Sequence, residues 1–316
     1  MRVRRRWAAG LAAVAAAGCW AAAAGAAAGQ PTTDGAAAAS AIRASAPCGV
    51  RPVVWIRHVI VIVMENHSFG EVIGHAPYID ALAGRCGLAT AYSAVSHPSL
   101  PNYLAITSGR TLGVGSDCAP AQCSFPVNSI FAQVGGLHLA WHAFEESMPA
   151  PCDLSSSGVY AVKHDPAAYY TAGGVRAACA RDVTRLGNWT SGPLHAALAG
   201  SLPAYNFVTP NVCNDMHDCP VSTGDLWLHR WIPAIIASPA YQSGTTVVLI
   251  TWDEGGSAGN TVPLIVVSPA TPRGVRSARP LSHYSLLRTS EYLLGAHRFL
   301  GGAARAAGLS RTFNIW

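Results

Sequence analysis

Two runs of aliphatic residues constrain the fold of this chain more than any other feature of the sequence. Residues 56–64 read IRHVIVIVM and residues 245–251 read TTVVLIT. A nearly continuous β-branched run predicts a strand that is buried on both faces, which is typical of a parallel sheet covered by helices. Each run ends abruptly in polar residues, so the same two segments also indicate where a site can form.

Further strand and helix patterns alternate along the chain. Strands are predicted at residues 88–95, 137–144, 204–209 and 262–268, and helices at 76–86, 101–108, 225–237 and 284–294. Such alternation predicts one α/β domain over residues 51–316, with a mostly parallel central sheet between helices. Residues 110–128 and 146–192 carry four cysteines and many small residues. We expect them to be disulfide-stapled loop insertions and not a second core.

The N-terminus has the pattern of a secretory signal peptide over residues 1–28. Residues 1–6 are basic, and residues 8–28 are alanine-rich with small residues suited to cleavage. A transmembrane anchor is the alternative, because the run is long enough to span a bilayer. Lipidation at Cys19 also stays open, although the usual large aliphatic residue before it is missing. Residues 29–50 predict a flexible linker, and we expect a secreted or cell-envelope protein without stable membrane insertion after processing.

The cysteine count agrees with export. Nine cysteines are present, and eight remain when Cys19 leaves with the leader. An even number in an exported chain predicts disulfides. Neighbouring positions suggest the pairs Cys48–Cys86, Cys118–Cys123, Cys152–Cys179 and Cys213–Cys219. A zinc site is the alternative, which the absence of any CxxC pair disfavours.

The charge of the body of the chain is nearly balanced. The net charge is +5, but beyond residue 30 there are 17 basic and 16 acidic residues. Nucleic-acid binding rests on clustered cations that neutralise phosphates. The composition therefore argues against nucleic acid as a partner.

Three carboxylates follow the two aliphatic runs. Glu65, with Asn66 beside it, comes after the first run, and Asp253 and Glu254 come after the second. Buried carboxylates need compensation, and no arginine lies beside these clusters in the sequence. A divalent cation supplies it: oxygen ligands suit Mg²⁺, Ca²⁺ or Mn²⁺, and Zn²⁺ becomes an option if histidines join them.

Ser99 lies between Pro98 and Pro101 at a predicted strand-to-helix junction. The free backbone N–H groups of a helix N-terminus bind anions and favour an alkoxide there. Asn102 adds a neutral donor close by. The alternative is that Ser99 or Ser96 merely caps the helix.

Two histidines are candidates for binding phosphate, for protonating a leaving group or for holding a second metal. His217 is flanked by acids in a loop between two cysteines, and His283 precedes a predicted helix. Acidic neighbours can orient an imidazole. Packed structural roles are expected for His58, His138, His142, His164, His229 and His297.

Five motifs in this order resemble the bacterial phosphoesterase family, which contains phospholipases C and secreted acid phosphatases within the alkaline-phosphatase-like fold. They are MENHSF at 64–69, SHPSLPNYL at 96–104, the segment 210–218, WDEGG at 252–256 and HYSLLR at 283–288. The resemblance implies a metal held by Glu65, Asn66, Asp253 and Glu254. It also implies that Ser99 is the nucleophile and coordinates the same metal.

Two departures from the phospholipase pattern favour a phosphatase. That branch reads ENRSFD and uses threonine, whereas this chain has ENHSFG and Ser99. Ser-x-Pro-Asn also resembles the Thr-x-Pro-Asn of nucleotide pyrophosphatases, in which the asparagine holds a phosphate oxygen, here Asn102. We therefore expect hydrolysis of phosphate monoesters, phosphoinositide headgroups included, through a phosphoserine. The substrate would be a small-molecule or lipid phosphate ester. A phospholipase C-type phosphodiesterase and a non-catalytic exported binding protein are the alternatives.

Overall fold

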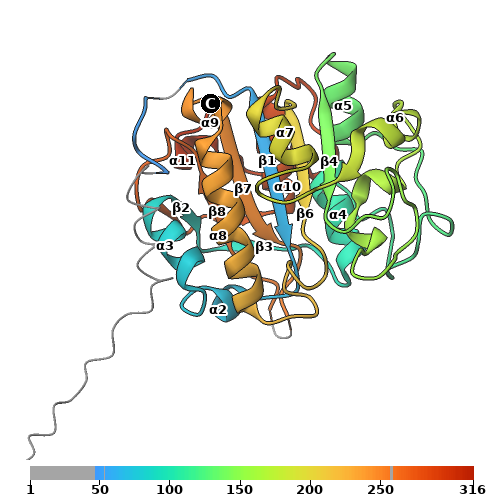
Figure 1. Cartoon of the computed structure of the whole chain (residues 1–316), viewed down its shortest axis with the longest axis horizontal. Helices are drawn as coiled ribbons and strands as arrows, with labels where there is room; N and C mark the ends of the chain where they lie inside the picture. Colours follow the sequence, from blue (N-terminus) through green and yellow to red (C-terminus); the bar gives the residue numbers. More distant parts are fainter. Residues whose placement is uncertain (1–46, 53, 257–258) are drawn as a thin grey trace, which may run out of the picture.

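An eight-stranded sheet forms the centre of the molecule (Figure 1). The computed structural model describes residues 47–52, 54–256 and 259–316. The strand order is β5-β4-β6-β1-β7-β8-β2-β9, and β3 and β10 form a separate pair. The strands are β1 (His58–Met64), β2 (Gly87–Ala89), β3 (Tyr92–Ser93), β4 (Trp141–Glu145), β5 (Val183–Arg185), β6 (Tyr205–Thr209), β7 (Thr246–Trp252), β8 (Leu264–Val267), β9 (Arg276–Ser277) and β10 (Leu281–Ser282).

The sheet is mostly parallel, as predicted. Strands β5, β4, β6, β1 and β7 run parallel, whereas β8 is antiparallel to both β7 and β2. The α/β fold class is thereby confirmed. The connection between β7 and β8, residues 253–263, contains no helix or strand among its described residues, whereas a parallel return usually needs a crossover helix.

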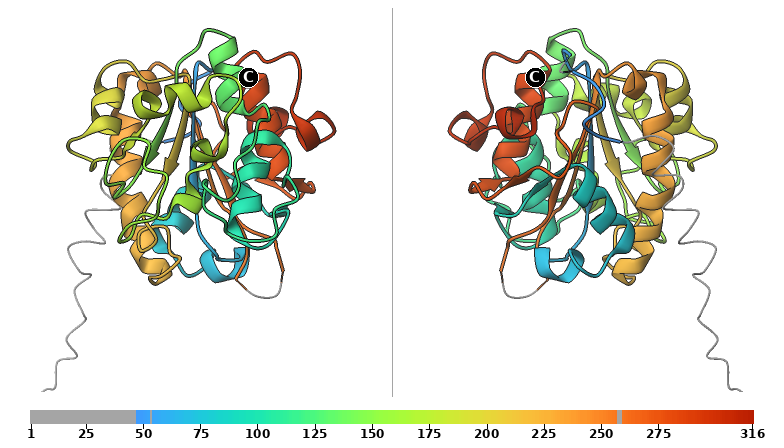
Figure 2. Two further views of the ribbon diagram at one scale, coloured as in Figure 1. Left: turned by 90° about the vertical axis from the view of Figure 1, so that its right-hand side faces the viewer. Right: turned by 90° about the vertical axis from the view of Figure 1, so that its left-hand side faces the viewer.

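Helices cover both faces of the sheet (Figure 2). Helices α4 and α10 pack against each other on one face, and α8 packs with α3, α7 and α9 on the other. The helices are α2 (Phe69–Val72), α3 (Pro77–Arg85), α4 (Ser99–Ser108), α5 (Ile130–Gly136), α6 (Val175–Asp182), α7 (Pro193–Ala199), α8 (Val221–Ala237), α9 (Pro239–Gln242), α10 (His283–Leu293) and α11 (Ser310–Phe313), with 3-10 turns η1 (Val162–His164), η2 (Pro166–Tyr169) and η3 (Gly301–Ala304).

The two aliphatic runs become the central strands β1 and β7. Their register pairs His58 with Thr246 and continues to Met64 with Trp252. Nearly every residue of the two strands is fully buried, because helices cover both faces. Since Met64 and Trp252 are partners, the residues that follow them, Glu65 and Asp253, leave the sheet side by side at the same edge.

Several predicted elements change their extent. The strand expected at 88–95 is divided into β2 and β3, and the helix expected at 101–108 begins at Ser99. The strand expected at 137–144 starts only at Trp141, because residues before it form a turn with His138 in the left-handed region at φ 58°. The insertion 146–192 contributes β5 to the edge of the main sheet, which the sequence pattern does not indicate.

All four predicted disulfides are present. They join Cys48 to Cys86, Cys118 to Cys123, Cys152 to Cys179 and Cys213 to Cys219. The predicted signal peptide and residues 29–46 of the predicted linker lie outside the described residues. The last linker residues are packed on the domain: Cys48 is fully buried, and Val50 N donates to Pro269 O at 2.9 Å.

Across the described part of the chain, we find no helix with the length and apolar character needed to cross a membrane.

Candidate active site

Glu65 connects the end of β1 with helix α4. Its carboxylate is fully buried; Oε2 accepts a hydrogen bond from Ser99 Oγ at 3.1 Å, and Oε1 accepts one from the Tyr103 hydroxyl. Ser99 and Tyr103 are four residues apart, so they lie on the same face of the helix, one above the other. The carboxylate thus fixes the first turn of α4 against the edge of the sheet.

Ser99 is the first residue of α4 and does not cap it. Pro98 occupies the N-cap position and makes no capping hydrogen bond with its side chain. Ser96 Oγ donates to His97 O at 3.2 Å, so the capping alternative is met by neither serine. The Ser99 side chain is only 1% exposed and points to Glu65 instead.

Asn66 and Asp253 complete the acidic edge. Asn66 is in the left-handed region at φ 48°, and its backbone N–H donates to Asp253 Oδ1 at 3.1 Å. The oxygen of the Asn66 amide lies 3.1 Å from Glu65 Oε2 and 3.3 Å from Asp253 Oδ1, so that one acceptor faces two others. Either a cation among the oxygens or a turned amide relieves the repulsion. Burial, and then the charge of Glu254, raises the pKa of Asp253 to about 7.

His164 and Asp215 belong to the same cluster, although the sequence analysis assigned His164 a structural role. His164 Nε2 lies 3.3 Å from Glu65 Oε1, and its Nδ1 lies 3.3 Å from Asp215 Oδ2. The ring stacks on Tyr103 with a centroid distance of 5.2 Å. Burial lowers the pKa of His164, so the imidazole is neutral, and burial raises the pKa of Asp215 to about 8.

His217 lies at this cluster in the loop closed by the Cys213–Cys219 disulfide. Its Nδ1 is 2.7 Å from Asp218 Oδ1, the acidic neighbour that the sequence suggests as an orienting group. Its Nε2 is 3.3 Å from Lys163 Nζ. The sequence analysis missed this lysine at the site.

Lys163 also ties the cluster to the start of α4 through Asp117. Lys163 Nζ is 3.0 Å from Asp117 Oδ2, and Asp117 Oδ1 accepts from Leu100 N at 3.0 Å. Burial acts to lower the pKa of Lys163, but the Asp117 hydrogen bond and nearby carboxylate charges outweigh it and raise that pKa. The cluster therefore contains one permanent positive charge.

His283, Asn102 and Glu254 were also predicted from the sequence, and all three make hydrogen bonds with residues outside the cluster or with its backbone. His283 Nε2 is 2.6 Å from the backbone oxygen of Asp253 and its Nδ1 is 2.8 Å from the Tyr92 hydroxyl. Burial lowers the pKa of His283 to about 4, so the ring is neutral and positions Asp253 from behind.

Asn102 and Glu254 hold the loop that precedes Ser99. The Asn102 Oδ1 accepts from the backbone N–H of Val95 and Ser96, and its Nδ2 donates to Ser96 O, Pro98 O and Glu254 Oε2. Glu254 also lies 2.9 Å from His97 Nδ1. Both amide hydrogens of Asn102 therefore have protein acceptors, and the Glu254 carboxylate is engaged by Asn102 and His97.

The donor atoms of the cluster suit a divalent cation. Glu65, His164 and His217 offer one ligand atom each, all within 4.8 Å of one another. Asp253 Oδ2, Asp215 Oδ2 and His164 Nε2 are buried without a hydrogen-bond partner. Buried polar atoms are rarely left unpaired, because the desolvation cost is high. A mixed oxygen and imidazole set fits the predicted metals, zinc included.

One sequence signal for the missed residues was available. Lys163 is the only lysine of the chain, and it directly precedes His164. The pair lies within the insertion 146–192, which is predicted to be a disulfide-stapled loop. Because this insertion is far in sequence from β1, the sequence pattern does not predict the contact between His164 and Glu65.

The solved structures that resemble this one share its fold. One is a protein in the alkaline phosphatase superfamily from Vibrio parahaemolyticus, with a TM-score of 0.54 at 10% identity over 84% of this chain and 76% of that chain. Another is a lipoteichoic acid synthase from Listeria monocytogenes, with a TM-score of 0.53 at 11% identity over 79% and 76%.

The sequence relatives are phosphatases. A phosphatidylinositol-3-phosphatase of Mycobacterium tuberculosis is 31% identical over 75% of this chain and 77% of its own length. A phosphate-repressible acid phosphatase of Penicillium chrysogenum is 29% identical over 79% of this chain and 61% of its own. An acid phosphatase of Aspergillus fumigatus is 29% identical over 71% and 54%. This chain thus spans only part of the fungal enzymes.

The family match and the phosphatase relatives together define a hydrolase of phosphoric esters. The chain belongs to the Phosphoesterase family, whose sequence profile matches residues 75–296.

Proposed function

We propose that the protein is an exported, metal-dependent phosphatase that hydrolyses phosphate monoesters through a phosphoserine on Ser99. One observation carries the proposal: the Ser99 hydroxyl, at the start of α4, donates to Glu65 inside the cluster of buried carboxylates and imidazoles. A serine held in this way has no capping role, and Lys163 is linked through Asp117 to Leu100, the residue that follows Ser99.

The residues proposed to hold the metal are Glu65, Asn66, Asp253 and Ser99, with His164 and Asp215 adding a nitrogen and an oxygen donor. Glu254 was expected among them; because it faces His97 and Asn102, we assign it to the loop before Ser99. A bound divalent cation would lower the pKa of a coordinated hydroxyl and neutralise charge on phosphoryl oxygens. Mg²⁺, Ca²⁺, Mn²⁺ and Zn²⁺ are the metals to test.

The chain's own residues supply orientation and charge. Glu65 Oε2 holds the Ser99 hydroxyl, and Tyr103 fixes the other oxygen of the same carboxylate. The Ser99 hydroxyl gives its proton to Glu65 Oε2 as Oγ bonds to phosphorus and the ester oxygen departs. Water then attacks the phosphoserine, the bond between phosphorus and Oγ breaks, and Oγ regains a proton as phosphate leaves. Lys163 faces the phosphoryl oxygens, and His217, oriented by Asp218, gives the leaving oxygen its proton.

Asn102 and His283 take supporting parts in this proposal. Asn102 shapes the loop that presents Ser99, and His283 orients Asp253 through its backbone oxygen. Both roles follow from hydrogen bonds that leave no ring nitrogen or amide hydrogen for the substrate. Direct phosphate contact by these two residues is therefore not part of the proposed mechanism.

The substrate class follows from the relatives. The Mycobacterium tuberculosis relative is named for a phosphoinositide and the fungal relatives are named acid phosphatases. A monoester, free or on a lipid headgroup, is what these names share. Export is supported by four disulfides, which persist in oxidising compartments, and by the predicted signal peptide.

Two measurements test the proposal. Parallel turnover of p-nitrophenyl phosphate and p-nitrophenylphosphorylcholine separates a monoesterase from a phospholipase C-type enzyme, and we expect faster turnover of the monoester. Acid quenching with ³²P-labelled substrate should trap phosphate on the peptide that contains Ser99. Faster diester turnover would contradict the substrate class, and label on another residue would contradict the nucleophile. No turnover of either ester with any of the four metals would favour a binding protein.

A further inference from the structure

Positive charge is concentrated in the last part of the domain. Residues 255–316 contain seven arginines and one acid, Glu291, a net charge of +6. Residues 47–254 contain nine basic and fourteen acidic residues, a net charge of −5. The near-neutral total therefore hides two regions of opposite sign.

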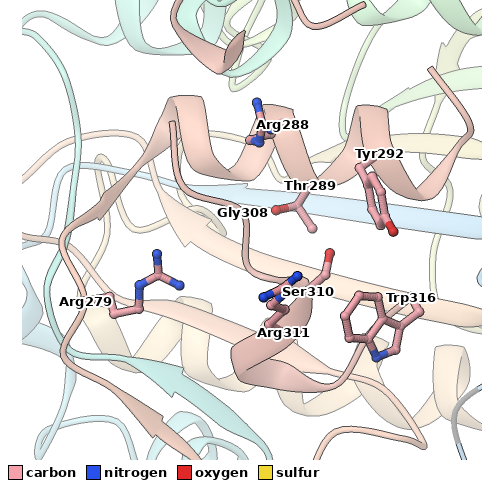
Figure 3. Close-up of a pocket in the computed structure, with 8 residues that line it drawn as sticks. All are labelled: Arg279, Arg288, Thr289, Tyr292, Gly308, Ser310, Arg311 and Trp316. Atoms are coloured by element: carbon pink, nitrogen blue, oxygen red, sulfur yellow. The ribbon is translucent and has the colours of Figure 1, made fainter. Parts of the chain in front are cut away.

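Three of these arginines line one cavity. It has a volume of about 430 Å³ and lies between α10 and the C-terminal segment that contains α11 (Figure 3). Small-molecule sites have volumes of roughly 300–1,000 Å³. The side chains that matter for its chemistry are Arg279, Arg288, Arg311, Ser310, Tyr292 and Trp316. None of the residues that line it belongs to the cluster around Ser99.

Neither Arg279 nor Arg311 has a carboxylate partner among the described residues, and Arg288 lies near the charge of Glu291 without forming an ion pair with it. None of the ion pairs among the described residues includes Arg279, Arg288 or Arg311. Arg288 is held in place, because its Nη1 donates to Ala303 O at 2.9 Å and its Cζ lies 4.2 Å from the centre of the Phe299 ring. In Figure 3 the side chains of Arg279 and Arg311 extend in the direction of α10.

Like charges around one cavity repel, and an anion among them removes that cost. Glu291 does not serve as this anion: its carboxylate is buried and accepts from Leu300 N at 2.8 Å. Guanidinium groups bind phosphate oxygens in pairs through their planar fork of N–H donors. A phosphate group is thus an anion whose oxygens suit the guanidinium donors of Arg279 and Arg311.

The other side of the cavity is aromatic. Tyr292 and Trp316 lie together at the opposite side of the view from Arg279, and they are 43% and 36% exposed. Their rings offer flat apolar surface to the rest of a small ligand. The Ser310 hydroxyl, at the same cavity, adds a neutral donor or acceptor.

We propose that this cavity is a second phosphate-binding site, separate from the catalytic centre. The arginines take the phosphate oxygens, and Tyr292 and Trp316 contact the remainder of the ligand. Free phosphate and a phosphorylated headgroup both carry the recognised group. The cavity shares no lining residue with the cluster around Ser99, so the proposal does not depend on the role of Ser99. On α10, Arg288 lies five residues beyond His283, about 7.5 Å further along the helix.

Calorimetric titration of the full chain tests the proposal. The background is a Ser99→Ala variant, and the probes are inorganic phosphate and a soluble inositol phosphate. We expect two bound ions per chain. Arg279→Gln with Arg311→Gln should remove one of them or weaken it at least about tenfold, since hydrogen bonds between guanidinium and phosphate groups are charge-assisted and strong. Arg298→Gln with Arg305→Gln is the matched control, because it removes two charges from the same segment without touching the cavity lining.

Phosphate binding that Arg279→Gln with Arg311→Gln leaves unchanged, or equal weakening by the control pair, would overturn the proposal. If the cavity variant does not fold by circular dichroism, Arg279→Lys with Arg311→Lys replaces it. That variant keeps the charge without the fork, and unchanged affinity in it would also overturn the assignment.

The two probes identify the source of the phosphate. Inositol phosphate that binds about tenfold more tightly than inorganic phosphate supports a headgroup site, and similar affinities support a site for the free product. Hydrolysis of inositol phosphate by the Ser99→Ala variant would refute the nucleophile, but it would leave the inorganic phosphate titration unaffected. Failure of the two proposals can thus be told apart.

Discussion

The carboxyl edge of the sheet carries an excess of negative charge, whereas the arginine-lined cavity carries an excess of positive charge. Glu65, Asp215 and Asp253 converge on one point with Lys163 as the nearby cation, and all three acids are fully buried. At the cavity, Arg279 and Arg311 are exposed and face no carboxylate among the residues that the structure describes. The same rule predicts a cation at one place and an anion at the other. Because burial strengthens electrostatic interactions, the loss of the cation should cost far more than the loss of the anion.

The largest effect should come from Ser99→Ala. Loss of a covalent nucleophile should reduce kcat on p-nitrophenyl phosphate by at least about 1,000-fold, given the size of enzymatic accelerations. Ser96→Ala is the control, since the Ser96 hydroxyl donates only to His97 O. Thermal denaturation should show both variants folded. A Ser99→Ala enzyme within about tenfold of the parent would remove Ser99 as nucleophile.

Asp253→Asn should come next and should act through the metal. The substitution removes a charge beside Glu65 and Asn66, so the metal content by elemental analysis and the Tm in metal-containing buffer should both fall. Asp80→Asn is the control, because Asp80 accepts only from Gly74 N at the distant helix α3. Equal metal content in the Asp253→Asn variant and the parent would contradict the metal site.

Removal of the Cys213–Cys219 disulfide should reduce kcat strongly and reduce the free energy of unfolding only a little. Its sequence separation is 6, against 27 for Cys152–Cys179. Chain entropy then assigns about 2 kcal/mol to the shorter bridge and about 3.5 kcal/mol to the longer one. Each pair is replaced by two serines, and kcat and denaturant unfolding are measured for both variants. Loss of Cys213–Cys219 should give the larger fall in kcat, because only this bridge closes the loop that carries His217. Loss of Cys152–Cys179 should give the larger fall in the free energy of unfolding. Unchanged kcat without the shorter bridge refutes its positioning role.

The smallest effect concerns Glu291, the one acid of the basic segment. Burial raises its pKa to about 7, while the Leu300 N–H and the charge of Arg288 act to lower it. The folded state therefore binds a proton that the unfolded chain releases near pH 4.5. This contribution to stability is complete below that pH and is lost as the pH rises through about 7.

As the pH rises from 4.5 to 8, the free energy of unfolding should fall less in a Glu291→Gln variant than in the parent. The two falls should differ by an amount on the order of 2 kcal/mol. Denaturant unfolding at several pH values measures the difference. Glu71→Gln is the control of opposite sign: hydrogen bonds from Ser68 lower the pKa of Glu71, so its contribution is lost as the pH falls. Parallel stability curves for the parent and Glu291→Gln would show that Glu291 does not differ in ionisation between the two states.

The two central strands show how far the sequence could predict the fold. Their aliphatic runs predict burial on both faces, and their pairing brings Glu65 beside Asp253 as expected. The reversal of β8 and the addition of β5 were not predicted, because hydrophobic pattern does not report strand direction or sheet order.

The candidate site was predicted where its residues follow strands of regular pattern. Glu65, Asn66, Ser99, Asp253 and His217 are brought together. Lys163 and His164 were not found, since they lie in a 3-10 turn of an irregular insertion whose path depends on tertiary contacts. The positions of Asn102 and Glu254 depend on hydrogen bonds that no spacing rule reveals.

The antiparallel return from β7 to β8 bears on how such an enzyme can diversify. Because β8 starts at the edge where β7 ends, the segment between them stays close to the loop before Ser99. Asn260 in this segment accepts from Gly255 N and donates to Ser96 O. Insertions in this hairpin would reshape access to Ser99 without shifting the register of any buried strand. For an engineer who wants to admit larger substrates, this hairpin is the segment to lengthen first.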